Sequence, residues 1–109
     1  MKEYIKVSGR SDINNLRIDF DYDLGGMNYF TGRAERRGYY ISIMPVYRTV
    51  RDGGWTSESY TAFTGVKTCL LEVARKSSKK EEEAKKLFEA EKQKYIDYML
   101  ERYNLTVEV

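Results

Sequence analysis

Arginines and aromatic residues are the side chains of this sequence that are best suited to bind a partner. Arg33, Arg36 and Arg37 stand in a short turn bounded by glycines, in the stretch TGRAERRG. Guanidinium groups bind carboxylates, phosphates and bases, and exposed rings stack on bases or peptide side chains. The predicted binding residues are Arg33, Arg36, Arg37, Tyr40, Tyr47, Arg48, Arg51 and Trp55. The competing interpretation is that the arginines pair with acidic neighbours, namely Glu35, Asp52 or the aspartates of residues 19–23, and only keep the turn soluble.

Three aspartates and one cysteine are the other groups that have reactive potential. Asp19, Asp21 and Asp23 alternate along one stretch, but the glycine and glutamate that a calcium-binding loop needs are missing from their required positions. We therefore expect neither a metal nor a cofactor, and we expect Asp19 or Asp21 to pair with arginines of a neighbouring strand. Cys69 stands among apolar residues, which predicts a buried and chemically inert thiol.

The absence of histidine limits the chemistry further. Without an imidazole the chain cannot build Ser-His-Asp or Cys-His nucleophilic systems or a two-histidine zinc helix. The two glycine pairs, at residues 25–26 and 53–54, lack the Lys-Ser/Thr of a phosphate-binding loop. We therefore predict that the protein is not an enzyme.

Length and composition indicate one domain over residues 1–109. Hydrophobic residues make up 41% of the chain and charged residues 33%, enough for a core beneath a highly charged surface. No run approaches the roughly 18 apolar residues of a membrane-spanning helix, the N-terminus lacks the apolar segment of a secretory signal, and the single cysteine fits a reducing compartment. A cytoplasmic location is the expectation. The net charge of +2 is too small for the whole surface to bind phosphates strongly.

Alternating apolar and polar residues predict strands in the first 63 residues. Residues 3–8, 16–23 and 39–44 alternate in this way, and the aspartates of residues 19–23 should form a solvent-facing side of their strand. Residues 46–51 and 55–62 flank an Asp-Gly-Gly turn, which predicts a hairpin. Pro45 requires a sheet edge, a bulge or a strand end.

Helical spacing replaces this alternation at Thr64. Val66, Cys69, Leu70 and Val73 recur as one apolar stripe, so we expect a helix capped by Thr64. A second helix is expected over residues 79–103, opened by Ser77 or Ser78 and ended by Asn104 in a left-handed conformation, before a closing strand from residue 105. The predicted fold is α+β: an antiparallel meander of about four or five strands, covered on one face by two C-terminal helices.

The second half of the last helix carries an unusually wide apolar band. Tyrosines at 95, 98 and 103 stand there among Ile96, Met99 and Leu100. Such a band packs on two sides or against another subunit. A homodimer through this half of the helix is therefore left open.

Two runs of the sequence resemble a known group of proteins. GGMNYFTGRAERRGYYISIMPVYRT and SYTAFTGVKTCLLEVARKSSKK, within Gly25 to Lys80, are similar to small uncharacterised proteins carried on conjugative and other mobile elements of gut-dwelling anaerobic bacteria. The resemblance implies no fold, activity or site residues. It implies an accessory role for a mobile element or phage: transfer, regulation, or inhibition of host defences such as CRISPR nucleases.

Two hypotheses of function follow. In the first, the chain is a non-enzymatic binding protein that docks on a protein of the host or of the element, in the manner of an anti-CRISPR inhibitor. In the second, it is a small nucleic-acid-binding regulator whose basic and aromatic residues follow the phosphate backbone. The stretch Arg75 to Lys80, RKSSKK, would extend that basic surface.

Overall fold

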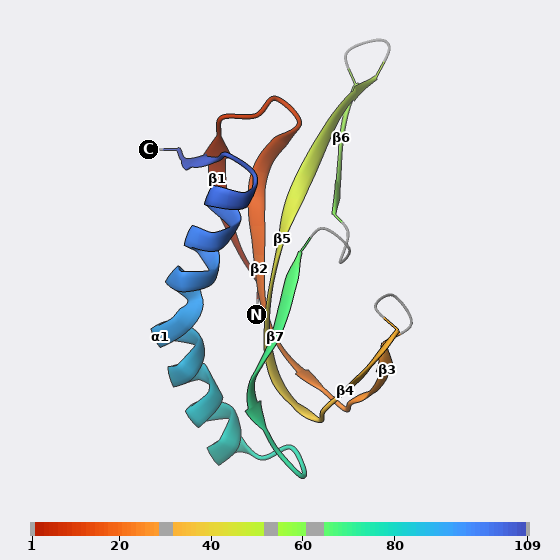
Figure 1. Cartoon of the computed structure of the whole chain (residues 1–109), viewed down its shortest axis with the longest axis vertical. Helices are drawn as coiled ribbons and strands as arrows, with labels where there is room; N and C mark the ends of the chain where they lie inside the picture. The colour runs from red at the N-terminus through yellow and green to blue at the C-terminus, as the bar shows by residue number, and fades with distance from the viewer. Residues whose placement is uncertain (1, 29–31, 52–54, 61–64, 109) are drawn as a thin grey trace.

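In the part of the chain that the structure describes, one helix covers one face of an antiparallel sheet, and a short hairpin lies on the other side of that sheet (Figure 1). The computed structural model describes residues 2–28, 32–51, 55–60 and 65–108, and for residues 28, 49–51 and 55–60 it describes the backbone alone. The strands are β1 Lys2–Ser8, β2 Ile13–Asp23, β3 Gly26–Asn28, β4 Arg33–Glu35, β5 Gly38–Arg51, β6 Trp55–Tyr60, β7 Val66–Glu72 and β8 Thr106–Val107, and the helix is α1 Ser78–Arg102.

The sheet has six strands, and β5 is the one with the most neighbours. Its order is β6-β5-β2-β1-β8, and β7 also pairs with β5; every pair is antiparallel. The two remaining strands, β3 and β4, pair only with each other. The predicted α+β class and antiparallel meander are confirmed. The predicted hairpin around residue 52 is confirmed by the pairing of Arg51 with Trp55, while residues 52–54 lie outside the described residues.

The core forms between the helix-facing side of β2 and β5 and the inner face of α1. Ile18 pairs with Ile43, and Phe20 with Ile41, so apolar side chains of both strands meet on one face of the sheet. Phe88 reaches down from α1 and meets Phe20 edge to face, with the ring centroids 5.4 Å apart. The buried set also includes Leu16, Tyr39, Ala84, Ile96 and Met99.

The ends of α1 lie where the sequence predicts them. Ser77 is the N-cap, and its hydroxyl accepts from the backbone N–H of Lys80 at 3.2 Å. Asn104 takes a φ of 54°, the left-handed conformation that ends a helix. The chain then reaches β8, where Val107 pairs with Val7 of β1. In the part of the chain that the structure describes, no helix is long and apolar enough to cross a membrane.

The first of the two predicted helices is wrong, because residues 66–72 form strand β7. A bulge explains the misleading pattern: Tyr39 pairs with Leu71 and Tyr40 with Cys69, so Leu70 is an extra residue on β7. This extra residue breaks the two-residue alternation of the strand and imitates helical spacing. The predicted cap, Thr64, lies outside the described residues.

Only part of the aspartate side of β2 faces solvent as alternation predicts: Asp21 is exposed and Asp23 is half-buried. Arg17 and Asp19 are buried there, with side chains 8% and 6% exposed, and form an ion pair of 3.0 Å. Residues two apart on a strand share a face, so the arginine comes from the same strand and not from a neighbouring one as expected. Each buried charge is balanced by the other.

Truncation of Phe88 tests the core. Phe88→Ala should lower the free energy of unfolding by about 3–5 kcal/mol, because a buried ring is lost and a cavity remains against Phe20. Lys86→Ala, an exposed change on the same helix, should stay within about 0.5 kcal/mol of the parent. Urea unfolding followed by circular dichroism measures both, and equal effects of the two variants would contradict this packing.

Candidate functional site

We call the segment that contains Arg33, Arg36 and Arg37 the arginine turn. It forms strand β4 and part of the base of the β3–β4 hairpin. Met27 pairs with Ala34 and Gly26 with Glu35, so the chain doubles back within a few residues. The hairpin lies on the side of the sheet opposite α1 (Figure 1). Arg33 is exposed on β4, and Arg36 and Arg37 follow between β4 and β5.

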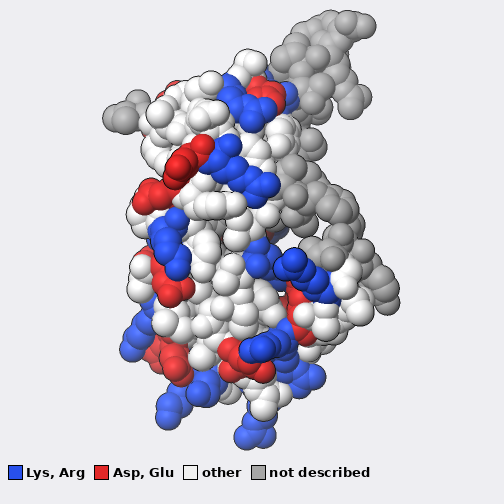
Figure 2. Space-filling model, viewed as in Figure 1, with Lys and Arg blue, Asp and Glu red and all other residues white. Residues whose placement is uncertain are grey.

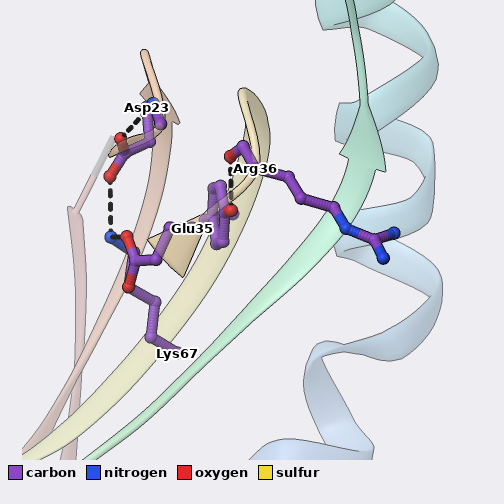
Figure 3. Close-up of polar contacts among 6 residues, drawn as sticks. Asp23, Glu35, Arg36 and Lys67 are labelled. Carbon is purple, nitrogen blue, oxygen red and sulfur yellow. Dashed lines mark hydrogen bonds and ion pairs between the residues drawn. The ribbon is translucent and has the colours of Figure 1, made fainter. Parts of the chain in front are cut away.

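Lys67 of β7 connects the hairpin to the sheet. Its Nζ lies 2.7 Å from a carboxylate oxygen of Asp23 and 2.8 Å from one of Glu35, and 4.8 Å from the centroid of the Tyr40 ring (Figure 3). These contacts join β7, β2 and β4. We call Lys67, Asp23 and Glu35 the lysine clamp.

The ion pair between Lys67 and Asp23 shifts the pKa values of both groups. The hydrogen bond from Lys67 lowers the pKa of Asp23 below its usual range, and the N–H of Gly25 adds to this effect. Burial by itself lowers the pKa of Lys67, but the hydrogen bonds to Asp23 and Glu35 outweigh burial and raise it. Asp23 and Lys67 are therefore both held in their charged forms.

Gly25 makes the sharp turn into the hairpin possible. Its φ is +83°, and its N–H donates to Oδ1 of Asp23 at 2.8 Å. A Cβ at this position would lie 2.8 Å from the backbone nitrogen of Arg37 and 2.9 Å from the carbonyl oxygen of Glu35. Only glycine fits both this conformation and this space.

Arg37 has a structural role. Its Nη1 donates to the carbonyl oxygen of Ala74 at 2.9 Å and its Nε to that of Leu24 at 3.3 Å. Its own carbonyl accepts from the N–H of Val73 at 3.0 Å. Arg37 therefore fastens the start of the hairpin to the segment between β7 and α1.

Arg36 points a different way from its neighbour. Its side chain extends across β7 toward α1 (Figure 3), where Nη1 lies 3.0 Å from a carboxylate oxygen of Glu72. This side chain is 75% exposed. Its backbone carbonyl accepts a hydrogen bond from the hydroxyl of Tyr40.

Tyr40 is buried, which corrects the expectation that it is available to a partner. It is 6% exposed and lies beneath Lys67. Burial raises the pKa of its hydroxyl, and Cys69 and the clamp carboxylates add to this. Cys69 pairs with Tyr40 and is half-buried, so its predicted burial on an apolar helical stripe is also wrong: strand alternation places it on the face away from α1.

The structure divides the predicted binding residues into two groups. Arg33, Arg36, Arg37 and Tyr40 lie at one end of β5. Tyr47 stands seven residues beyond Tyr40, which places it on the opposite face and about 23 Å further along the strand. It packs against the core, and its neighbour Arg48 is exposed. The backbones of Arg51 and Trp55 pair farther out still, and their side chains lie outside the described residues.

Two exposed apolar residues beside the arginines were missed in the sequence. Leu24 is 69% exposed and Met27 is 57% exposed, at the start of the hairpin and on β3. The signal that was available is their position next to the Gly25-Gly26 break, where a turn leaves no room to bury a side chain. Lys67 was also missed, because the predicted helix placed it on a solvent-facing side.

A pocket of about 280 Å³ opens beside the lysine clamp on the face away from α1. Asp21, Ser42 and Met44 line it together with clamp residues. Asp19 and Asp23, which also line it, are already paired with Arg17 and Lys67. Among the described residues no group of three or more cysteine, aspartate or glutamate side chains is arranged to hold a metal ion.

Comparisons with known proteins give no relative for this chain: no protein-family model matches its sequence, and no curated protein or solved structure matches it either. Its function must therefore be argued from the geometry of its own residues.

The three arginines of the turn should differ in their effect on stability. Arg37→Ala should cost about 1–2 kcal/mol, because two carbonyl groups lose a charged donor. Arg33→Ala and Arg36→Ala should stay within about 0.5 kcal/mol, because both side chains are exposed. Thermal and urea unfolding of the three single variants measure this order, and a stable Arg37→Ala protein would contradict the structural role.

The lysine clamp predicts a loss of stability in acid. The pKa of Asp23 is lower in the folded chain than in the unfolded one, so its contribution is complete above the unfolded value of about 3.9 and disappears as the pH falls through the folded value. Asp23→Asn should cost about 1 kcal/mol at pH 7, and this gap should close toward pH 2.

Urea unfolding between pH 7 and pH 2 measures the gap. Asp21→Asn removes a carboxylate from the same strand without touching Lys67, and it should track the parent protein at neutral pH. A gap that stays constant down to pH 2 would show that the clamp contributes no ionic stabilisation.

Proposed function

We propose that this chain is a non-enzymatic binding protein that docks on another protein through the β3–β4 hairpin and the arginine turn. The observation that carries the proposal is the exposure of two large apolar side chains, Leu24 just before β3 and Met27 on β3, with the exposed Arg33 on the neighbouring strand β4. Arginine and methionine are enriched in protein interfaces, and apolar anchors supply most of the affinity at such surfaces. We call this surface the docking hairpin.

The rigidity of its base supports this proposal. The lysine clamp fixes the base of the hairpin to β2 and β7, Arg37 fixes it to the segment between β7 and α1, and Gly25 forms the tight turn that leads into it. A surface that is already ordered loses less conformational entropy on binding than a flexible loop does. Exposed apolar residues on such a base are suited to docking.

The partner we propose is a protein of the bacterial host or of the mobile element. This follows from the resemblance of residues 25–80 to accessory proteins of such elements, whose roles include inhibition of host defence. A small protein without histidine can inhibit a larger one by covering its surface, with no catalytic step.

One observation favours nucleic acid as a second candidate. The bond from Arg37 to Ala74 brings the arginine turn beside Arg75 and Lys76, and Figure 2 shows basic side chains gathered at the end of the molecule where α1 begins. The charge there is mixed, since Glu72 pairs with Arg36 and Glu83 with Lys80. Lys76 lies over the ring of half-buried Tyr22, 5.5 Å from its centroid, which leaves this ring poorly placed to stack on a base.

Removal of the apolar anchors tests the first proposal. The partner is identified by affinity capture from the bacterial host with mass spectrometry, and binding is then measured with the purified partner. The double variant Leu24→Ser, Met27→Ser should weaken binding at least about tenfold, because both anchors are lost. Its melting temperature should stay within about 2 °C of the parent, because neither side chain is buried.

Val107→Ser is the matched control, since Val107 is also exposed and apolar but lies on β8 at another edge of the sheet. It should leave binding unchanged. Equal loss in the control and the double variant would contradict the docking hairpin. Salt separates the two candidates: an affinity for DNA that falls steeply between about 50 and 200 mM salt would favour the nucleic-acid function.

A further inference from the structure

Strand β7 has one edge that no described strand covers. It pairs with Gly38–Ile43 of β5 on one side, and within the described ranges nothing pairs with its other side. Backbone N–H and C=O groups on such an outer edge form a template for another strand. The seven residues of β7 are long enough to bind an extended peptide.

An apolar pocket lies at the start of this strand. Val66, the first residue of β7, lines a shallow pocket of about 300 Å³ with Lys94, Tyr95 and Tyr98 of α1. Tyr98 is 49% exposed although it borders the core side of the helix. The Nζ of Lys94 lies 5.1 Å from the centroid of the Tyr95 ring, which gives the pocket a cationic rim. An apolar side chain fits this pocket, and an acidic one fits its rim.

Arg36 lies at the other end of β7. Its side chain crosses the strand (Figure 3). Its guanidinium pairs with Glu72, the last residue of β7, and remains exposed. From Val66 to Glu72 the strand rises about 20 Å. The outer edge therefore has an apolar pocket at one end and an arginine at the other.

We propose that the outer edge of β7 binds an extended, acidic segment of a protein partner as an additional antiparallel strand. An apolar side chain of the segment enters the pocket of Val66, Tyr95 and Tyr98, and a carboxylate near its other end pairs with Arg36. Backbone hydrogen bonds to β7 supply affinity, and these two side-chain contacts supply specificity. This edge shares Arg36 with the arginine turn but uses neither Leu24 nor Met27, so the inference does not depend on those two anchors making a contact.

A partner segment fits this edge better than a second copy of the chain. Antiparallel pairing of two β7 strands would bring Lys67 of one copy toward both Arg36 and Glu72 of the other, so like charges would meet as well as opposite ones. It would also require two rigid strands, each bulged at Leu70, to match along their length. A flexible segment can follow the bulge, and its acidic residues complement Arg36 and Lys94.

A synthetic peptide tests this proposal with the full chain. The probe is an acetylated octapeptide of two aspartates, then alternating threonine and valine, then a C-terminal leucine amide. This order sets the aspartates near Arg36 and the leucine near Val66. In an NMR titration of the ¹⁵N-labelled protein, amide shifts should concentrate in Val66–Glu72 and Lys94–Tyr98, and amides of β7 should become more protected from hydrogen exchange.

Variants of both ends should weaken the peptide. Tyr98→Ser and Arg36→Glu should each reduce affinity at least about fivefold. Lys86→Glu, an equivalent charge change at an exposed position of α1, is the matched control and should leave affinity within about twofold. A peptide with lysines in place of the aspartates should bind at least about fivefold more weakly.

Four outcomes would overturn the proposal. The first two are no saturable binding at millimolar peptide, and amide shifts confined to other parts of the sheet. The third is equal affinity for the lysine peptide and the aspartate peptide, and the fourth is a chain that is already dimeric, with the β7 amides protected from exchange before peptide is added. The last outcome would assign the edge to a second copy. The double variant Leu24→Ser, Met27→Ser should bind the peptide normally, so a failure of the docking hairpin and a failure of this edge are observed separately.

Discussion

Strand β5 has two different partners along one edge, and the rest of the structure depends on where it changes from one to the other. It pairs with β7 up to Ile43 and with β6 from Val46 onward, and among the residues that the structure describes Met44 and Pro45 between them pair only with β2. Proline has no N–H to donate, so it fits the point in β5 where one strand partner gives way to the next. The change of partner limits β7 to seven residues. Its position beside the first half of β5 is what brings Lys67 within reach of the hairpin.

Most of the fold could be predicted from the sequence, where one side-chain period holds without interruption. Strands β1, β2 and β5 alternate regularly, and the caps of α1 at Ser77 and Asn104 are local signals that do not depend on tertiary contacts. The sequence does not reveal β7 as a strand, because the bulge that interrupts its alternation is defined by the partner strand. Leu70 is an extra residue only in relation to Tyr39 and Tyr40. A pairing between residues about thirty positions apart leaves no mark in the local period.

The candidate site was predicted less well than the fold, because the sequence does not indicate in which direction each side chain points. The sequence identifies a turn rich in arginine, but Arg36 and Arg37 are adjacent and project differently, one across β7 and one onto the carbonyl groups of Leu24 and Ala74. Three of the expected partners are instead held elsewhere: Glu35 and Asp23 by Lys67, and Asp19 by Arg17 of its own strand. Composition indicates how many charges a region has, and the register of the strands decides which of them meet.

The contacts of the charged residues at the base of the hairpin explain why apolar side chains are exposed on it. Lys67, Asp23, Glu35 and Arg37 are all engaged at its base, and the base joins segments from β2, β4, β7 and the approach to α1. Salt bridges at partly exposed positions contribute little stability individually, but several of them that act on one small hairpin restrict its orientation. With the ionic groups committed to holding the hairpin, Leu24 and Met27 remain as its outward contacts, and Arg36 is the cation that lies between this surface and the outer edge of β7. The arginine turn is therefore part scaffold and part surface, and the boundary between the two runs between Arg36 and Arg37.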